Sequence, residues 1–162
     1  MKLRIMAVAL AGACVTGCVS SGGADAIKPI ASDVATKSYV KEVVLAGTPD
    51  GASPQFKDTF ASKVSDKLKD CAKGTKALRL EATIVDFHRS SGLKTWMIGD
   101  ANRIKGTAKL IDPESGAVVA DYDINRSVGG GGLIAAVAMS DAEGQMSTAF
   151  GDELCKRAFV SR

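Results

Sequence analysis

The stretch NRIKGTAKLI (residues 102–111), continued by DPESG (112–116) and AVVADYDIN (117–125), decides the fold. In both flanks apolar or small residues alternate with polar ones: Ile104, Gly106, Ala108 and Leu110, then Val118, Ala120, Tyr122 and Ile124. Such a period of two is typical of a strand with one buried and one solvated face. DPESG has its proline early and its glycine last, as a tight turn requires. The stretch therefore predicts an antiparallel hairpin.

Opposite charges on the solvated faces favour one register for this hairpin. Lys105 and Lys109 are predicted to face Asp121 and Asp123, each pair contributing a few tenths of a kcal/mol, on the order of 0.3. The preceding ALRLEATIVDF (77–87) shows the same alternation and predicts a third strand of the antiparallel meander.

Upstream, KSYVKEVVLAG (37–47) predicts a first strand, and an amphipathic helix follows it. The helix is indicated by apolar residues at every fourth position: Phe56, Phe60, Val64 and Leu68. Ser53 before Pro54 predicts its start, with the Ser53 hydroxyl as N-cap, and Gly74 predicts its end.

After VGGGG (128–132) the pattern is helical from Leu133 to about Val160, with Gly144 as a candidate break. The order of elements predicts an α+β fold. We expect a two-layer sandwich, β-α-β-β-β-α, whose mainly antiparallel four-stranded sheet carries two helices on one face.

No catalytic constellation is visible. The single histidine, His88, lies two residues from Asp86, and Ser90 and Ser91 lack the G-x-S-x-G context of an activated serine. The run of glycines at 129–132 lacks the lysine of a phosphate-binding loop. One histidine and no closely spaced cysteines after residue 18 give no metal site. The chain is predicted to be a non-enzyme without cofactor or metal.

Trp96, Met97 and Ile98 are three consecutive large apolar residues in a predicted loop. Two interpretations stay open: they fold back over the core, or they form an exposed contact for a partner protein or a lipid surface. They are the candidate partner-binding residues.

The N-terminal residues indicate an export signal. Lys2 and Arg4 precede IMAVALAGACV (5–15), which is too short to span a bilayer, a task that needs about 20 apolar residues. Val15-Thr16-Gly17-Cys18 resembles the lipobox of bacterial lipoproteins. The resemblance implies that residues 1–17 are a signal peptide, that Cys18 is diacylated, and that the chain is held to a membrane by this lipid. The alternative is a short N-terminal helix with two buried cysteines.

By the same resemblance, valine rather than aspartate after Cys18 implies the outer membrane, with the domain facing the periplasm. Residues 18–36, rich in small and polar side chains, are predicted to be a flexible tether, and residues 37–162 a single α+β periplasmic domain. The competing interpretation of 19–36 is an extended segment lying along the domain.

Cys71 and Cys155 remain after removal of the signal. An even pair in an exported chain predicts a disulfide, and small residues beside Cys155 would let its helix approach that of Cys71. Two buried free thiols are the alternative. Without Lys2 and Arg4, 19 basic residues oppose 18 acidic ones, a net charge of +1 that gives no footprint for nucleic acid.

The order strand–helix–three strands–helix resembles small bacterial lipoproteins of unknown function, whose domain is similar to the N-terminal domain of TolB and to parts of the curli secretion lipoprotein. The resemblance implies an accessory or assembly subunit of a cell-envelope complex, with an envelope protein as partner. A periplasmic carrier of a small apolar or lipidic ligand is the alternative. The oligomeric state stays open.

Overall fold

The computed structural model describes residues 19–90, 100–129 and 141–160. Its strands are β1 (Val19–Lys28), β2 (Ser38–Leu45), β3 (Lys76–His88), β4 (Asn102–Ile111) and β5 (Val118–Gly129). The helices of the described residues are α1 (Ser32–Lys37), α2 (Phe56–Cys71) and α5 (Ala142–Ala158).

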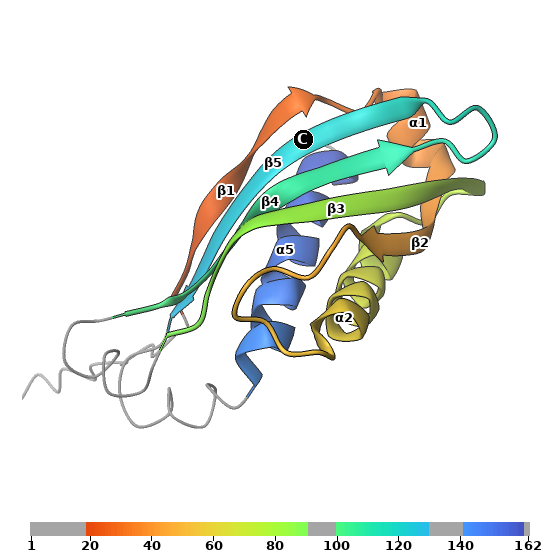
Figure 1. The fold of residues 1–162 in the computed structure, drawn as a ribbon. Helices are drawn as coiled ribbons and strands as arrows, with labels where there is room; N and C mark the ends of the chain where they lie inside the picture. Colours follow the sequence, from red (N-terminus) through yellow and green to blue (C-terminus); the bar gives the residue numbers. More distant parts are fainter. Residues whose placement is uncertain (1–18, 91–99, 130–140, 161–162) are drawn as a thin grey trace, which may run out of the picture.

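The strands form one sheet in the order β1-β5-β4-β3-β2, and α2 and α5 cover the same face of it (Figure 1). The α+β class and the placing of these two helices on one face are as predicted. The predicted four-stranded sheet is wrong in detail: the sheet has five strands. It is also mixed, because β2 and β3 run parallel while the other neighbours are antiparallel. The helical crossover through α2 returns the chain to the end of the sheet from which β2 began, which makes β2 and β3 parallel.

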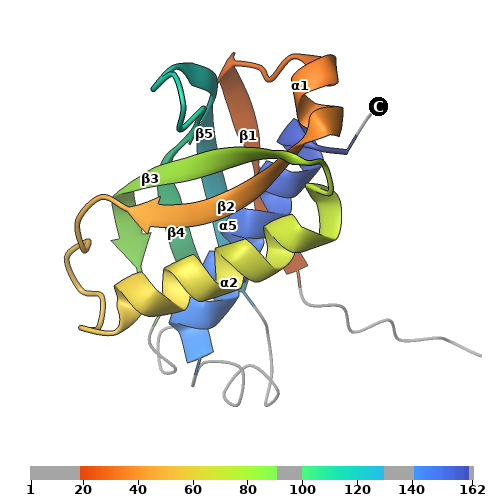
Figure 2. The same ribbon diagram turned by 90° about the vertical axis from the view of Figure 1, so that its right-hand side faces the viewer.

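The tether predicted for residues 18–36 differs from the structure. Residues 19–28 form the edge strand β1, which pairs with β5 from Val19 opposite Gly129 to Lys28 opposite Asp121. The competing interpretation, an extended segment along the domain, describes this part of the chain. Composition does not distinguish the two structures, because small side chains suit a flexible linker and also allow a backbone to lie closely along a sheet edge. Here β5 provides hydrogen-bond partners for the backbone of β1. After β1, α1 carries the chain across one end of the sheet to β2 on the opposite edge (Figure 2).

The hairpin is confirmed, and β4 occupies the predicted residues. Its register places Lys109 opposite Asp121, as predicted, but Lys105 opposite Asn125 and Asp123 opposite Thr107. One of the two expected charge pairs is therefore directly opposed. No antiparallel register can directly oppose both pairs, because the two lysines lie four residues apart and the two aspartates only two.

The core lies between the sheet and the two covering helices. The predicted stripe of α2 is completely buried: Phe56, Phe60, Val64 and Leu68. From α5, Phe150 meets Phe60 with ring centroids 5.2 Å apart. The predicted N-cap is wrong, because α2 is preceded by Gln55 without a side-chain cap. Ser53 hydrogen-bonds Glu143 instead, which ties the start of α2 to the first turn of α5.

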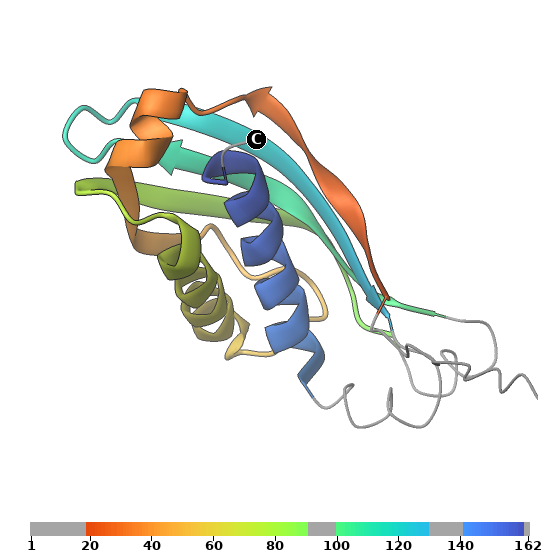
Figure 3. The same ribbon diagram turned by 180° about the vertical axis from the view of Figure 1, so that it is seen from behind.

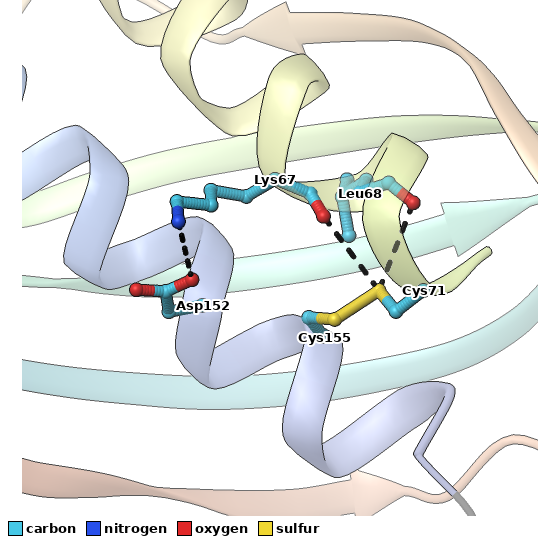
Figure 4. Close-up of a disulfide and its surroundings, with 5 residues drawn as sticks. All are labelled: Lys67, Leu68, Cys71, Asp152 and Cys155. Carbon is cyan, nitrogen blue, oxygen red and sulfur yellow. Dashed lines mark hydrogen bonds and ion pairs between the residues drawn. A yellow bond between two sulfur atoms is a disulfide. The ribbon is translucent and has the colours of Figure 1, made fainter.

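A disulfide between Cys71 and Cys155 joins the ends of α2 and α5, with Cα atoms 6.0 Å apart (Figure 4). One turn away, Lys67 and Asp152 form an ion pair of 3.3 Å between the same helices. Gly151 permits this close packing, since a Cβ there would lie 3.1 Å from the Cα of Val64. The predicted disulfide is therefore present, on the small-residue side of α5.

The hairpin turn is held to the start of β3 by an ion pair. Lys76 Nζ lies 2.6 Å from Asp112 Oδ2, and the other carboxylate oxygen of Asp112 accepts the backbone N–H of Glu114 at 3.0 Å. The hydrogen bond from Lys76 and that from the Glu114 backbone hold the pKa of Asp112 below its usual value. The same contact raises the pKa of Lys76.

This ion pair gives a pH-dependent contribution to stability. Because the pKa of Asp112 is lower in the folded state, its contribution is fully present above the ordinary value of 3.8 and is lost as pH falls through the folded value. Asp112→Asn should therefore destabilise the protein at pH 6, and the gap to wild type should shrink below pH 3.8. Urea unfolding at both pH values measures this difference in the free energy of unfolding between wild type and variant. Asp66→Asn, in the exposed pair with Lys69, is the control with little effect at either pH. An equal gap for Asp112→Asn at both pH values would contradict the assignment.

Candidate functional site

A groove of about 470 Å³ lies between β1, α1 and the C-terminal end of α5. Figures 2 and 3 show the end of α5 close to α1 and to the edge of the sheet that carries β1. Small or apolar side chains make up most of its lining: Ala24, Ala26, Pro29, Ile30, Ala35, Tyr122, Ala158, Phe159 and Val160.

Two cations and a serine complete the lining. Lys156 and Arg157, both exposed, belong to the last turn of α5, and Ser32 opens α1. No aspartate or glutamate is among the lining residues. At the floor, the buried Tyr122 accepts a hydrogen bond of 3.1 Å from the backbone N–H of Ile30, which fixes the segment leading into α1. The arrangement offers an apolar surface with positive charge at one side.

A buried charge network adjoins the groove through Arg157. Glu153, 5% exposed, accepts hydrogen bonds from Arg126 Nη1 at 3.1 Å and from Arg157 Nε at 3.0 Å. Arg126, 8% exposed, also donates to the carbonyl of Gly22 at 3.4 Å. One carboxylate thus serves two guanidinium groups, and the network joins α5, β5 and β1. Arg157 belongs to both the network and the groove.

This network was not predicted from the sequence, although a signal for it was present. Arg126 continues the buried series of β5, two residues beyond Ile124, which is itself two beyond Tyr122. Glu153 lies beside Leu154 on the buried side of α5. A charged residue in phase with a buried stripe predicts a buried partner. Nothing in the local pattern identifies which partner, because Arg126 and Glu153 meet only through the tertiary packing of α5 against the sheet.

A second polar cluster lies at the other end of the sheet, where β3 ends and β4 begins. His88 Nε2 is 3.1 Å from both carboxylate oxygens of Asp100. The backbone N–H and hydroxyl of Ser90 both donate to Asn102 Oδ1, at 2.9 and 3.1 Å. Histidine and acid are paired, but the serine hydroxyl is engaged with an amide.

Glu143 extends this cluster to the helices. Its two carboxylate oxygens accept the backbone N–H of Ser53 at 2.8 Å and its hydroxyl at 2.7 Å, and Arg89 Nη1 lies 3.5 Å away. Asp141 caps α5 by accepting the backbone N–H of Gly144 at 3.1 Å. These contacts fix the start of α5 against the loop before α2.

Of the sequence-predicted site residues, the structure brings Cys71 and Cys155 together. Cys18 and the candidate partner-binding residues Trp96, Met97 and Ile98 lie outside the described residues. Within the described ranges, no three histidine, cysteine or carboxylate side chains gather as a metal site requires. In the same part of the chain, no helix has the length and apolar character needed to cross a bilayer.

No family model matches the sequence. No curated protein matches it either. The structure is similar to several solved ones. A PelC dodecamer from Paraburkholderia phytofirmans shares 13% identity, with 88% of this chain and 100% of that chain covered and a TM-score of 0.49. A protein provisionally described as a lipoprotein, from Caulobacter crescentus, shares 12% (70% and 84% covered; TM-score 0.42). A DUF330 protein from Xanthomonas campestris shares 19% (78% and 77% covered; TM-score 0.45).

Because of the buried network, replacing two neighbouring residues of α5 should change the free energy of unfolding by very different amounts. Glu153→Ala leaves Arg126 without its carboxylate in a buried site and should lower the free energy of unfolding by about 3–5 kcal/mol. Asp152→Ala removes only the part-exposed pair with Lys67 and should cost about 0–1 kcal/mol. Urea unfolding measures both. Similar losses for the two variants would show that the network contributes no more than a surface pair.

Proposed function

We propose that this chain is a lipid-anchored, non-enzymatic accessory or assembly subunit of a cell-envelope complex. It is held through Cys18 in the outer membrane, facing the periplasm, and its partner is an envelope protein. The lipobox-like Val15-Thr16-Gly17-Cys18 is the basis for the anchor. The structural observation that carries the proposal is the position of β1, which begins at Val19, directly after Cys18.

This position determines which end of the domain an anchor would hold. Val19 lies opposite Gly129 at the end of β5, and Val128 lies opposite Asn102 at the start of β4. His88, at the end of β3, pairs with Arg103 of β4. Four strands therefore start or finish at the end of the sheet next to Cys18. Without a spacer, a lipid on Cys18 would keep this end against the bilayer, and the 112–116 turn would lie at the far end (Figure 1).

The residues that flank the candidate contact residues lie at the anchored end. Ser90 and Asp100, on either side of residues 91–99, belong to the polar cluster of His88 and Asn102. The chain thus leaves and re-enters the described structure at the end of the sheet where β1 begins. We propose that Trp96, Met97 and Ile98 provide the contact with the lipid surface or the envelope partner from this end.

A non-enzymatic role is supported by the hydrogen bonding of the polar cluster. The hydroxyls of Ser53 and Ser90 donate to Glu143 and Asn102, and His88 is paired with Asp100. A nucleophilic serine requires its hydroxyl within hydrogen-bond reach of a base such as histidine. A ligand carrier remains the second candidate, and the groove beside α1 is the observation that favours it.

The anchor is tested by labelling cells that express the chain with radioactive palmitate. We expect label in the wild type and none in Cys18→Ser, because that variant lacks the acylated thiol. Cys14→Ser is the matched control: its cysteine lies in the segment to be removed, so label should persist. Mass spectrometry should also show that residues 1–17 are absent from the labelled protein. Label that depends on Cys14, or an intact N-terminus, would refute the anchor.

The orientation is tested with a photo-cross-linking amino acid at position 96 or, as control, at position 114 in the far turn. We expect lipid or envelope-protein adducts from position 96 that disappear when Cys18 is replaced by serine. Position 114 should give no such adducts, because it lies at the opposite end of the hairpin. Equal adducts from both positions, or adducts independent of Cys18, would contradict the proposed placement.

A further inference from the structure

The groove between β1, α1 and the end of α5 has the dimensions of a ligand site. Its volume of about 470 Å³ falls within the range of about 300–1,000 Å³ that small-molecule sites occupy. Three alanines, Ala24, Ala26 and Ala35, contribute to its lining and leave space that longer side chains would fill. Tyr122 is held rigidly at the floor by its hydrogen bond to Ile30.

An exposed apolar side chain lies at this groove. Val160, which lines it, is 54% exposed and is one of the three large hydrophobic side chains that are exposed among the described residues. With the partly exposed Ile30 and Phe159, it gives the groove an apolar surface that a ligand can reach.

The charge at the groove has one sign. Lys156 and Arg157 are the charged lining residues, and the lining contains no carboxylate. Glu153 cannot neutralise Arg157 fully, because it is shared with the buried Arg126. Guanidinium groups bind carboxylates by paired hydrogen bonds, so an anionic group matches this rim.

We propose that the groove binds a single-chain fatty acid. The acyl chain lies on the floor between Ala24, Ala26 and Tyr122, and the carboxylate pairs with Lys156 and Arg157. The proposal specifies the ligand of the carrier candidate and does not depend on the lipid anchor, since every lining residue belongs to the described part of the chain. It also concerns other residues than 91–99, which are proposed to contact a partner.

The test uses the chain from residue 18 with Cys18→Ser, which retains every described element and the disulfide. Octanoate, decanoate and laurate are titrated separately, below their micelle-forming concentrations, and backbone amide resonances are followed by NMR. We expect shifts centred on Ala26, Tyr122 and Phe159. Burying a methylene completely strengthens binding about fourfold, so a groove open to solvent on one side should give about twofold per methylene. Laurate should then bind roughly 16-fold more tightly than octanoate.

Charge and space are tested separately. Lys156→Gln with Arg157→Gln should weaken laurate binding about tenfold and leave the binding of decanol, which has no charge, unchanged. Lys156→Gln alone, with a smaller loss, serves if the double variant does not fold. Lys57→Gln with Lys63→Gln removes two exposed charges from α2 and is the matched control without effect. Ala26→Trp fills the groove and should abolish the binding of both laurate and decanol.

Several results would overturn the proposal. They are shifts centred away from the groove, affinity that does not depend on chain length, and equal losses in the α2 control. Shifts at the groove on diluting the ligand-free protein would show that a second copy of the chain occupies it. Tighter binding of a lysophospholipid with the laurate chain would reassign the site to a lipid headgroup. None of these outcomes bears on palmitate labelling at Cys18, so failure here is distinguishable from failure of the proposed anchor.

Discussion

The pairing of β1 with the edge of β5 is the constraint on which the rest of the architecture depends. It makes residues 19–28 part of the sheet, which removes the spacer between Cys18 and the folded domain. It also places Gly22 within reach of Arg126 and forms one wall of the groove. Because β1 lies on one edge and β2 on the other, the connection through α1 must cross the end of the sheet, and this crossing gives the groove its second wall.

A buried carboxylate shared by two arginines, one of which lines the groove, stabilises this arrangement. Burying charges is costly, and Glu153 offsets that cost by bonding both guanidinium groups. The network acts with the disulfide, because both attach the second half of α5 to neighbours: Cys155 to α2, and Glu153 to β5. Residues 153–157 are consequently fixed on two sides, which gives Lys156 and Arg157 a defined position at the rim.

Sequence periodicity predicted the elements whose own residue pattern shows which side is buried. The alternation in β3, β4 and β5 and the four-residue spacing in α2 report directly which side of each element is buried, and the structure agrees. The disulfide followed from cysteine count and export. Strand β1 was not predicted, because SSGGADA has neither alternation nor β-branched residues, and its extended form depends on an available edge. The Ser53 cap failed for a similar reason: Glu143, 90 residues away, competes for its hydroxyl.

The two ends of the sheet therefore differ in chemistry, and this difference limits how the proposed roles combine. The end next to Cys18 carries the polar cluster of His88, Asp100 and Glu143, whereas the groove lies beside the last turn of α5, toward the opposite end. A lipid anchor at Cys18 would direct the first end toward the bilayer and the groove away from it. A fatty acid would then reach the groove from the aqueous side rather than laterally from the membrane. An exposed pair of cations suits that route, because a ligand arriving through water is attracted by charge before its chain is buried.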